Sequence, residues 1–162
     1  MKAVVVYFSL NGHTKYVAEA VAAKLGAEIM ALEPKKAYPK ARALQMVVGG
    51  FGASVGLSRR LKPYRFGKSK YDLVVLATPV WAGKITPPMR RFLKEHPLGG
   101  VPIGLIASCA GGPTEATLGA MKAHAKNVVA ELSLVNPSAK EREKSSAAID
   151  NFCKELKAKH GV

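Results

Sequence analysis

Apolar residues in this chain occur in two arrangements, short continuous runs and stripes that repeat every three or four positions. Continuous runs are typical of strands covered on both faces, and the stripes are typical of amphipathic helices. The runs predict strands over residues 3–8, 73–77 and 101–107, and two further strands are expected over residues 28–32 and 128–134. Helical patterns separate these runs and the sequence has no internal repeat. We therefore expect one doubly wound α/β domain over residues 1–162, with right-handed crossovers.

Residues with strong turn and capping preferences mark the predicted helix ends. Gly26 is expected to end the first helix, and Thr86, which two prolines follow, to begin the third. Pro113 is expected to open the next helix. Ser138, with Glu141 three residues later, has the pattern of a capping box and predicts the start of the last helix.

Residues 35–70 have the least regular pattern in the chain. Residues 40–48 have helical spacing, and the glycine-rich remainder around Phe51 is expected to form a loop. A loop of this length inside a domain is uncommon unless it is functional or disordered.

The length and composition of the chain limit the classes of protein to which it can belong. A chain of 162 residues, 48% of them hydrophobic, can bury a sizeable core. No apolar run approaches the length of a membrane span, and the first residues lack the pattern of a signal peptide, so we expect a cytoplasmic protein. Cys109 and Cys153 lie far apart in the sequence without metal-ligand spacing. This argues against a disulfide framework and against a structural zinc site.

The chain is strongly basic, with 25 Lys and Arg against 11 Asp and Glu and a net charge of +14. Within residues 33–70 Glu33 is the only acidic residue. The basic residues there are Lys35, Lys36, Lys40, Arg42, Arg59, Arg60, Lys62, Arg65, Lys68 and Lys70. Such a stretch suits an acidic protein partner, an anionic cofactor or substrate, or nucleic acid, and it is also compatible with a solvated surface. Nucleic acid is the least favoured, because the stretch lacks a known docking element and has few aromatic residues.

Six residues join the first predicted strand to the first helix: Ser9, Leu10, Asn11, Gly12, His13 and Thr14. The free N–H groups and the dipole of such a helix start can hold a phosphate without a positively charged side chain. Gly12 lets the backbone approach the anion, and Ser9, Asn11 and Thr14 offer side-chain donors. The segment is equally compatible with an ordinary helix capped by Asn11 or Thr14. It matches neither a dinucleotide glycine fingerprint nor a nucleotidase P-loop, and His13 is expected to be a solvated residue rather than a base.

Two further loops are expected at the same edge of the sheet, where ligands of doubly wound folds bind. One consists of Thr78, Pro79, Val80, Trp81, Ala82 and Gly83 and holds the only tryptophan. The other consists of Ser108, Cys109, Ala110, Gly111 and Gly112 and offers backbone donors and acceptors to a polar heterocycle. A phosphate loop beside a flat aromatic residue predicts a mononucleotide with a large ring system. Trp81 could also be an ordinary packed aromatic residue, and Cys109 is expected to be a small loop residue rather than a nucleophile.

The chain resembles the flavodoxin family over nearly its whole length, with residues 35–70 the weakest part. Residues 9–14 are close to that family's phosphate loop, Ser/Thr-x-Thr/Asn-Gly-x-Thr, and residues 78–93 are similar to its second loop and helix. The resemblance implies a flavodoxin-like fold with helices on both faces of a five-stranded parallel sheet of order 2-1-3-4-5. It also implies non-covalent binding of FMN.

The resemblance also implies a role for each loop, by position. Ser9, Asn11, Gly12, His13 and Thr14 would take the phosphate. Residues 78–83 would take the ribityl chain and the ring, with Trp81 packed against the isoalloxazine, and residues 108–112 would meet the pyrimidine edge. A glycine among residues 49–52 is a candidate for the backbone that meets the flavin N5.

Two departures from the family's pattern bear on function. The chain is strongly basic, whereas flavodoxins that carry electrons are usually acidic, and its third loop lacks the aromatic residue that commonly covers the flavin. Our first expectation is an FMN-dependent electron-transfer protein with redox protein partners, acidic ones among them. An NAD(P)H-dependent flavin or quinone reductase is the alternative, and a nucleic-acid-binding module is the third reading.

Overall fold

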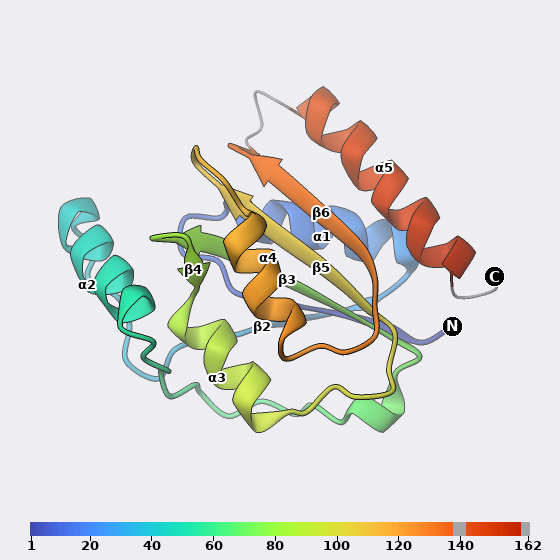
Figure 1. The fold of residues 1–162 in the computed structure, drawn as a ribbon, viewed down its shortest axis with the longest axis horizontal. Helices are drawn as coiled ribbons and strands as arrows, with labels where there is room; N and C mark the ends of the chain where they lie inside the picture. Colours follow the sequence, from blue (N-terminus) through green and yellow to red (C-terminus); the bar gives the residue numbers. More distant parts are fainter. Residues whose placement is uncertain (138–141, 160–162) are drawn as a thin grey trace.

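The computed structural model describes residues 1–137 and 142–159. Within these residues the long strands are β1 Ala3–Tyr7, β2 Glu28–Ala31, β3 Leu73–Trp81, β5 Ile103–Cys109 and β6 Val128–Val135. They pair in parallel in the order β2-β1-β3-β5-β6 (Figure 1). A short strand, β4 Lys84–Ile85, pairs antiparallel with the end of β3. When only the parallel strands are counted, this is the predicted order 2-1-3-4-5, and the predicted α/β class is confirmed.

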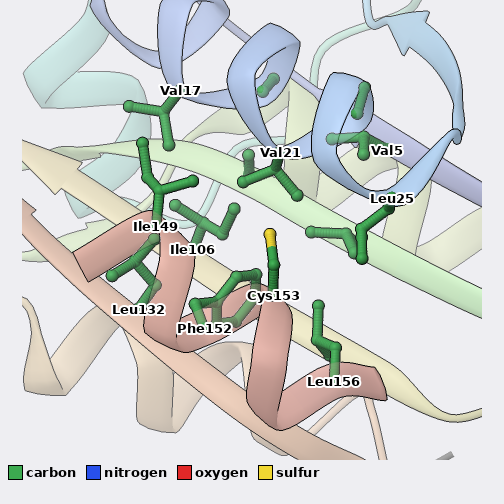
Figure 2. Close-up of a cluster of buried hydrophobic side chains, with 14 of the residues drawn as sticks. Val5, Val17, Val21, Leu25, Ile106, Leu132, Ile149, Phe152, Cys153 and Leu156 are labelled. Carbon is green, nitrogen blue, oxygen red and sulfur yellow. The ribbon is translucent and has the colours of Figure 1, made fainter. Parts of the chain in front are cut away.

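Helices cover both faces of the sheet. Helices α1 His13–Leu25 and α5 Arg142–Lys159 lie on one face, and α3 Pro87–Glu95 and α4 Glu115–Lys122 on the other. Figure 2 shows Val21 of α1 and Phe152 of α5 converging over the sheet, where Val5 and Ile106 are buried beneath them. Because successive strand residues point to opposite faces, the next residue along β1, Val6, packs in the other core. Burial on both faces explains why β1, β3 and β5 are continuous apolar runs, whereas the edge strands β2 and β6 leave residues such as Ile29 and Glu131 exposed.

The predicted helix ends are confirmed in part. Gly26 ends α1 in the left-handed conformation, with φ of 60°. Thr86 is the N-cap residue of α3, but its hydroxyl bonds to the Thr78 hydroxyl at 2.9 Å instead of capping the helix. Helix α4 begins at Glu115, two residues after the predicted start at Pro113. The predicted capping box of Ser138 and Glu141 lies outside the described residues.

The expected loop after residue 48 was wrong. Helix α2 Arg42–Ser54 runs through the glycines and lies at the margin of the molecule, beside β4 (Figure 1). Gly49 and Gly52 lie on the face of α2 that approaches the protein, and a methyl carbon built at Gly49 would lie 2.7 Å from Cζ3 of Trp81. Close packing against a large ring therefore outweighs the low helix propensity of glycine here.

The expected loop over residues 78–83 was also wrong in its first half. Strand β3 continues as far as Trp81 because β4 supplies a partner, with Val80 opposite Ile85. Ala82 and Gly83 make the turn between the two strands with φ of 50° and 67°. No helix in the described part of the chain is both long and apolar enough to cross a bilayer.

Candidate cofactor site

A cavity of about 350 Å³ lies at the carboxyl edge of the sheet. Its walls come from the ends of β1, β3, β5 and β6, from the start of α1 and from α2. The lining residues are Ser9, Leu10, Asn11, His13, Thr14, Gln45, Gly50, Pro79, Val80, Trp81, Ala82, Ser108, Cys109, Ala110, Asn136 and Pro137. The three predicted loops therefore meet in one cavity. Five of the predicted residues do not line it: Gly12, Thr78, Gly83, Gly111 and Gly112.

The start of α1 forms one wall of the cavity and is not capped by a side chain. Gly12 is the N-cap residue, with φ of 87°. Neither Asn11 nor Thr14 caps the helix with its side chain, so the alternative of an ordinary capped helix does not hold. The N–H of Gly12 donates to Ser9 Oγ at 3.1 Å, which shapes the loop. The first turn carries no acidic residue. Unsatisfied N–H groups and the helix dipole therefore give this wall a positive potential without a Lys or Arg.

Thr14 and Ser108 join two of the loops inside the cavity wall. Their hydroxyl oxygens are 2.8 Å apart, and both side chains are buried. If Ser108 donates its hydrogen, the Thr14 hydroxyl keeps its own hydrogen for a ligand. This contact orients Thr14 from a neighbouring strand, which the sequence alone did not indicate.

His13 lies at the same wall, where it is exposed and also makes a hydrogen bond. Its Nδ1 lies 3.0 Å from the carbonyl oxygen of Pro137, and because a carbonyl only accepts, the ring donates from Nδ1. Nε2 is then the nitrogen left for a ligand or for water.

Trp81 lies across the cavity from α1 and is also packed against the protein. Its ring meets those of Phe8 and Tyr38 edge-on, with centroids 5.5 and 5.1 Å away, and Gly49 of α2 approaches it closely. These contacts hold the indole in one orientation while leaving it part of the cavity wall.

The lining has the chemistry of a site for a polar, anionic ligand with an apolar ring. Among the lining residues none is Asp, Glu, Lys or Arg. Ser, Thr and Asn side chains lie at the α1 end, while Trp81, Pro79 and Val80 form an apolar wall. Cys109 donates to the carbonyl of Gly112 at 3.2 Å, and burial raises the pKa of its thiol, which keeps it protonated at neutral pH. This agrees with the expectation that Cys109 is not a nucleophile.

The same fold is present in solved flavoprotein structures. A Bacteroides uniformis protein described as a flavoprotein superposes with a TM-score of 0.74 at 18% identity, covering 92% of this chain and 97% of that one. A Lactobacillus acidophilus flavoprotein, solved in complex with FMN, gives 0.70 at 17% identity, covering 90% and 98%. A Streptococcus pneumoniae flavodoxin gives 0.59 at 20% identity, covering 98% and 99%. The chain has a flavodoxin-like fold. No protein-family model and no curated protein matches the sequence.

Three cavity residues were missed by the sequence reasoning: Gln45, Asn136 and Pro137. Gln45 comes from α2, which the pattern of glycines had suggested to be partly a loop, and Asn136 and Pro137 follow β6. Gly50 of α2 also lines the cavity and belongs to the glycines 49–52 that were expected near the flavin. In a flavodoxin-like fold the end of the last strand also reaches the ligand edge, so its position was the available signal for Asn136. Among the described residues no group of three His, Cys, Asp or Glu could hold a metal ion. Cys109 and Cys153 are both buried and are not joined by a disulfide.

Proposed function

We propose that the protein binds FMN in this cavity and transfers electrons between redox partners. One observation carries the proposal: an uncapped helix start and the only tryptophan face the same uncharged cavity from different elements. Flavin supplies one- and two-electron chemistry when bound, and the protein supplies binding and orientation. The FMN in the Lactobacillus acidophilus flavoprotein of the same fold supports this choice of ligand.

The residues present fit the parts of FMN. The backbone N–H groups at the start of α1 and the hydroxyls of Ser9 and Thr14 suit a phosphate, which needs donors and no nearby carboxylate. Trp81 and Val80 suit the apolar faces of a large ring. The volume of the cavity, about 350 Å³, is within the range of about 300 to 1,000 Å³ typical of small-molecule sites.

A reductase is the second candidate because one side of the cavity is open. Ala110, Gly111 and Gly112 are exposed, and among the lining residues Trp81 is the only Phe, Tyr or Trp. A flavin bound there would have one face uncovered, and a second substrate such as NAD(P)H or a quinone could reach it. The basic stretch before β3 supports an acidic partner or an anionic substrate.

Two measurements test these assignments. Protein mixed with FMN or with riboflavin is passed over a desalting column, and the absorption spectrum of the protein fraction is recorded. We expect retention of FMN with a shifted flavin spectrum and loss of most riboflavin, because the phosphate is the part that α1 holds. Loss of both flavins would contradict the proposal. If NADPH then bleaches the bound flavin without an added reductase, the protein is a reductase rather than a carrier.

A further inference from the structure

Helix α2 packs on the protein with its smallest residues and turns its largest ones outward. Gly49, Gly52 and Ala53 are buried against the body of the protein. Six large apolar side chains on α2 and just after its end have 39% to 65% of their surface exposed: Leu44, Val47, Val48, Phe51, Val55 and Leu57. We call these six residues the apolar stripe. The first five recur at the spacing of one helix face, and a continuous apolar face of this kind marks an interaction surface.

A cluster of cations lies where the chain enters and leaves this helix. The N–H of Lys35 donates to the Arg60 carbonyl at 2.8 Å, so the two flanking segments run side by side. Arg59 strengthens the junction, because its Nε donates to the Lys36 carbonyl at 3.0 Å and its guanidinium lies 4.0 Å over the Tyr38 ring. We call Lys35, Lys36, Arg59 and Arg60 the basic collar. No acidic residue occurs between Glu33 and Asp72.

We propose that the apolar stripe and the basic collar dock the protein on an anionic lipid bilayer. The stripe enters the interfacial region parallel to the membrane plane, and the collar binds the headgroups. A helix with Phe, Leu and Val on one face and Lys or Arg beside it is the pattern of a protein that lies on a membrane without crossing it. Anionic lipids attract such cations near the surface.

Charge favours a lipid surface over the other occupants of this face. A second copy of the chain would bring the same acid-free stretch and another net charge of +14 against the first. A protein partner would need a groove shaped for the stripe and carboxylates placed opposite the collar. A bilayer accepts apolar side chains without a matched shape, and its negative charge extends across the whole footprint of a basic protein. Since Gly50 of α2 lines the cavity, docking holds the cavity close to the bilayer.

Co-sedimentation of the full chain with vesicles tests the proposal. We expect binding to phosphatidylcholine vesicles that contain phosphatidylserine, little binding to pure phosphatidylcholine, and weaker binding as salt is raised. The double variant Val47→Gln/Phe51→Gln should bind at least about tenfold more weakly, because two side chains no longer enter the apolar region. Reversing two collar charges, Lys36→Glu/Arg60→Glu, should weaken binding by about thirtyfold or more.

Matched controls separate docking from misfolding and from general charge attraction. Ile29 is 46% exposed on β2, outside the stripe, so Ile29→Gln should bind vesicles like the wild type. The stripe positions are exposed, so the circular dichroism and unfolding midpoint of Val47→Gln/Phe51→Gln should be unchanged. No sedimentation with anionic vesicles would overturn the proposal, and so would binding that Val47→Gln/Phe51→Gln leaves intact. A dimer of the wild type in analytical ultracentrifugation that this double variant abolishes would assign the face to a second copy instead.

Discussion

Helices α2 and α3 contact each other, yet they bury opposite kinds of residue. Helix α3 places Met89, Phe92 and Leu93 in the core, as an amphipathic helix does. Helix α2 instead buries Gly49 and Ala53 and exposes its large apolar residues, Phe51 among them. Both helices therefore have a periodic apolar face, but the face of α3 is buried in the core and the face of α2 is exposed to solvent. Helix α3 stabilises the fold, while α2 completes a wall of the cavity and presents a surface.

The largest expected contrast is between the phenylalanines of these two helices. Phe92 is fully buried, so Phe92→Ala should lower the free energy of unfolding by about 3 to 5 kcal/mol through lost burial and a cavity. Phe51 is 64% exposed, so Phe51→Ala should change it by no more than about 0.5 kcal/mol. Urea unfolding of both variants measures the difference. Similar losses in the two would mean that α2 is packed much as α3 is.

The α1 wall of the cavity is joined to β5 by the hydrogen bond between Thr14 and Ser108, and a substitution of Thr14 tests the role of this wall. Thr14→Val removes a hydroxyl that we expect to donate to the FMN phosphate. This loss should weaken FMN by about 1.5 to 3 kcal/mol, which is about ten- to a hundredfold. Riboflavin affinity should stay unchanged, because riboflavin has no phosphate.

A matched control exists for this substitution in α4. Thr117 is also fully buried, and its hydroxyl has no hydrogen-bond partner in the structure. Thr117→Val should therefore leave FMN binding as it is, and calorimetric titration of both variants with FMN and riboflavin measures the contrast. Equal FMN affinity for wild type and Thr14→Val would place the phosphate elsewhere.

Two neighbouring glycines sharpen the account of the inner face of α2. A methyl group at Gly49 would press on Trp81, so Gly49→Ala should cost about 1 to 3 kcal/mol of stability. Nothing lies within 4 Å of a methyl group at Gly50, so Gly50→Ala should gain up to about 1 kcal/mol from helix propensity. Both substitutions raise helix propensity equally. The difference between their free energies of unfolding, measured by heat or urea, therefore gives the cost of packing a methyl group against Trp81. A gain in both variants would mean that α2 does not press on Trp81.

The smallest effect concerns pH and the far end of α3. Burial lowers the pKa of His96, which Glu95 partly offsets, and the Tyr64 hydroxyl lies 2.9 Å from His96 Nε2. The His96 imidazole therefore binds a proton more readily in the unfolded chain than in the folded protein. The stability that neutral His96 contributes to the folded state is present above about pH 6.5, and it is lost as the pH falls through the folded-state pKa. Unfolding followed from pH 7.5 to pH 5, roughly the range across an unperturbed histidine pKa, should show a shallower pH dependence for His96→Gln. An identical slope in wild type and variant would remove His96 as the cause.

The sequence predicted the parts of the fold whose local pattern agrees with their environment. The strands β1, β3 and β5 are apolar runs because both of their faces are covered, and the three loops meet because parallel strands end at one edge. Helix α2 was not fully predicted, because Gly49 is explained only by the ring of Trp81, a residue far along the chain. The Thr14 and Ser108 contact, 94 residues apart in sequence, was hidden for the same reason. The secondary-structure preference of a segment gives no information about contacts with residues far away in the sequence.

The most direct test of the proposed cofactor site uses the emission of Trp81, the only tryptophan in the chain. FMN is titrated into the apoprotein while tryptophan and flavin fluorescence are recorded together. If FMN fills the cavity that Trp81 lines, both signals should fall and saturate at about one FMN per chain, and Trp81→Phe should still bind FMN while lacking the tryptophan signal. A tryptophan emission that stays bright in protein shown to be saturated with FMN would contradict the placement of the flavin ring beside Trp81.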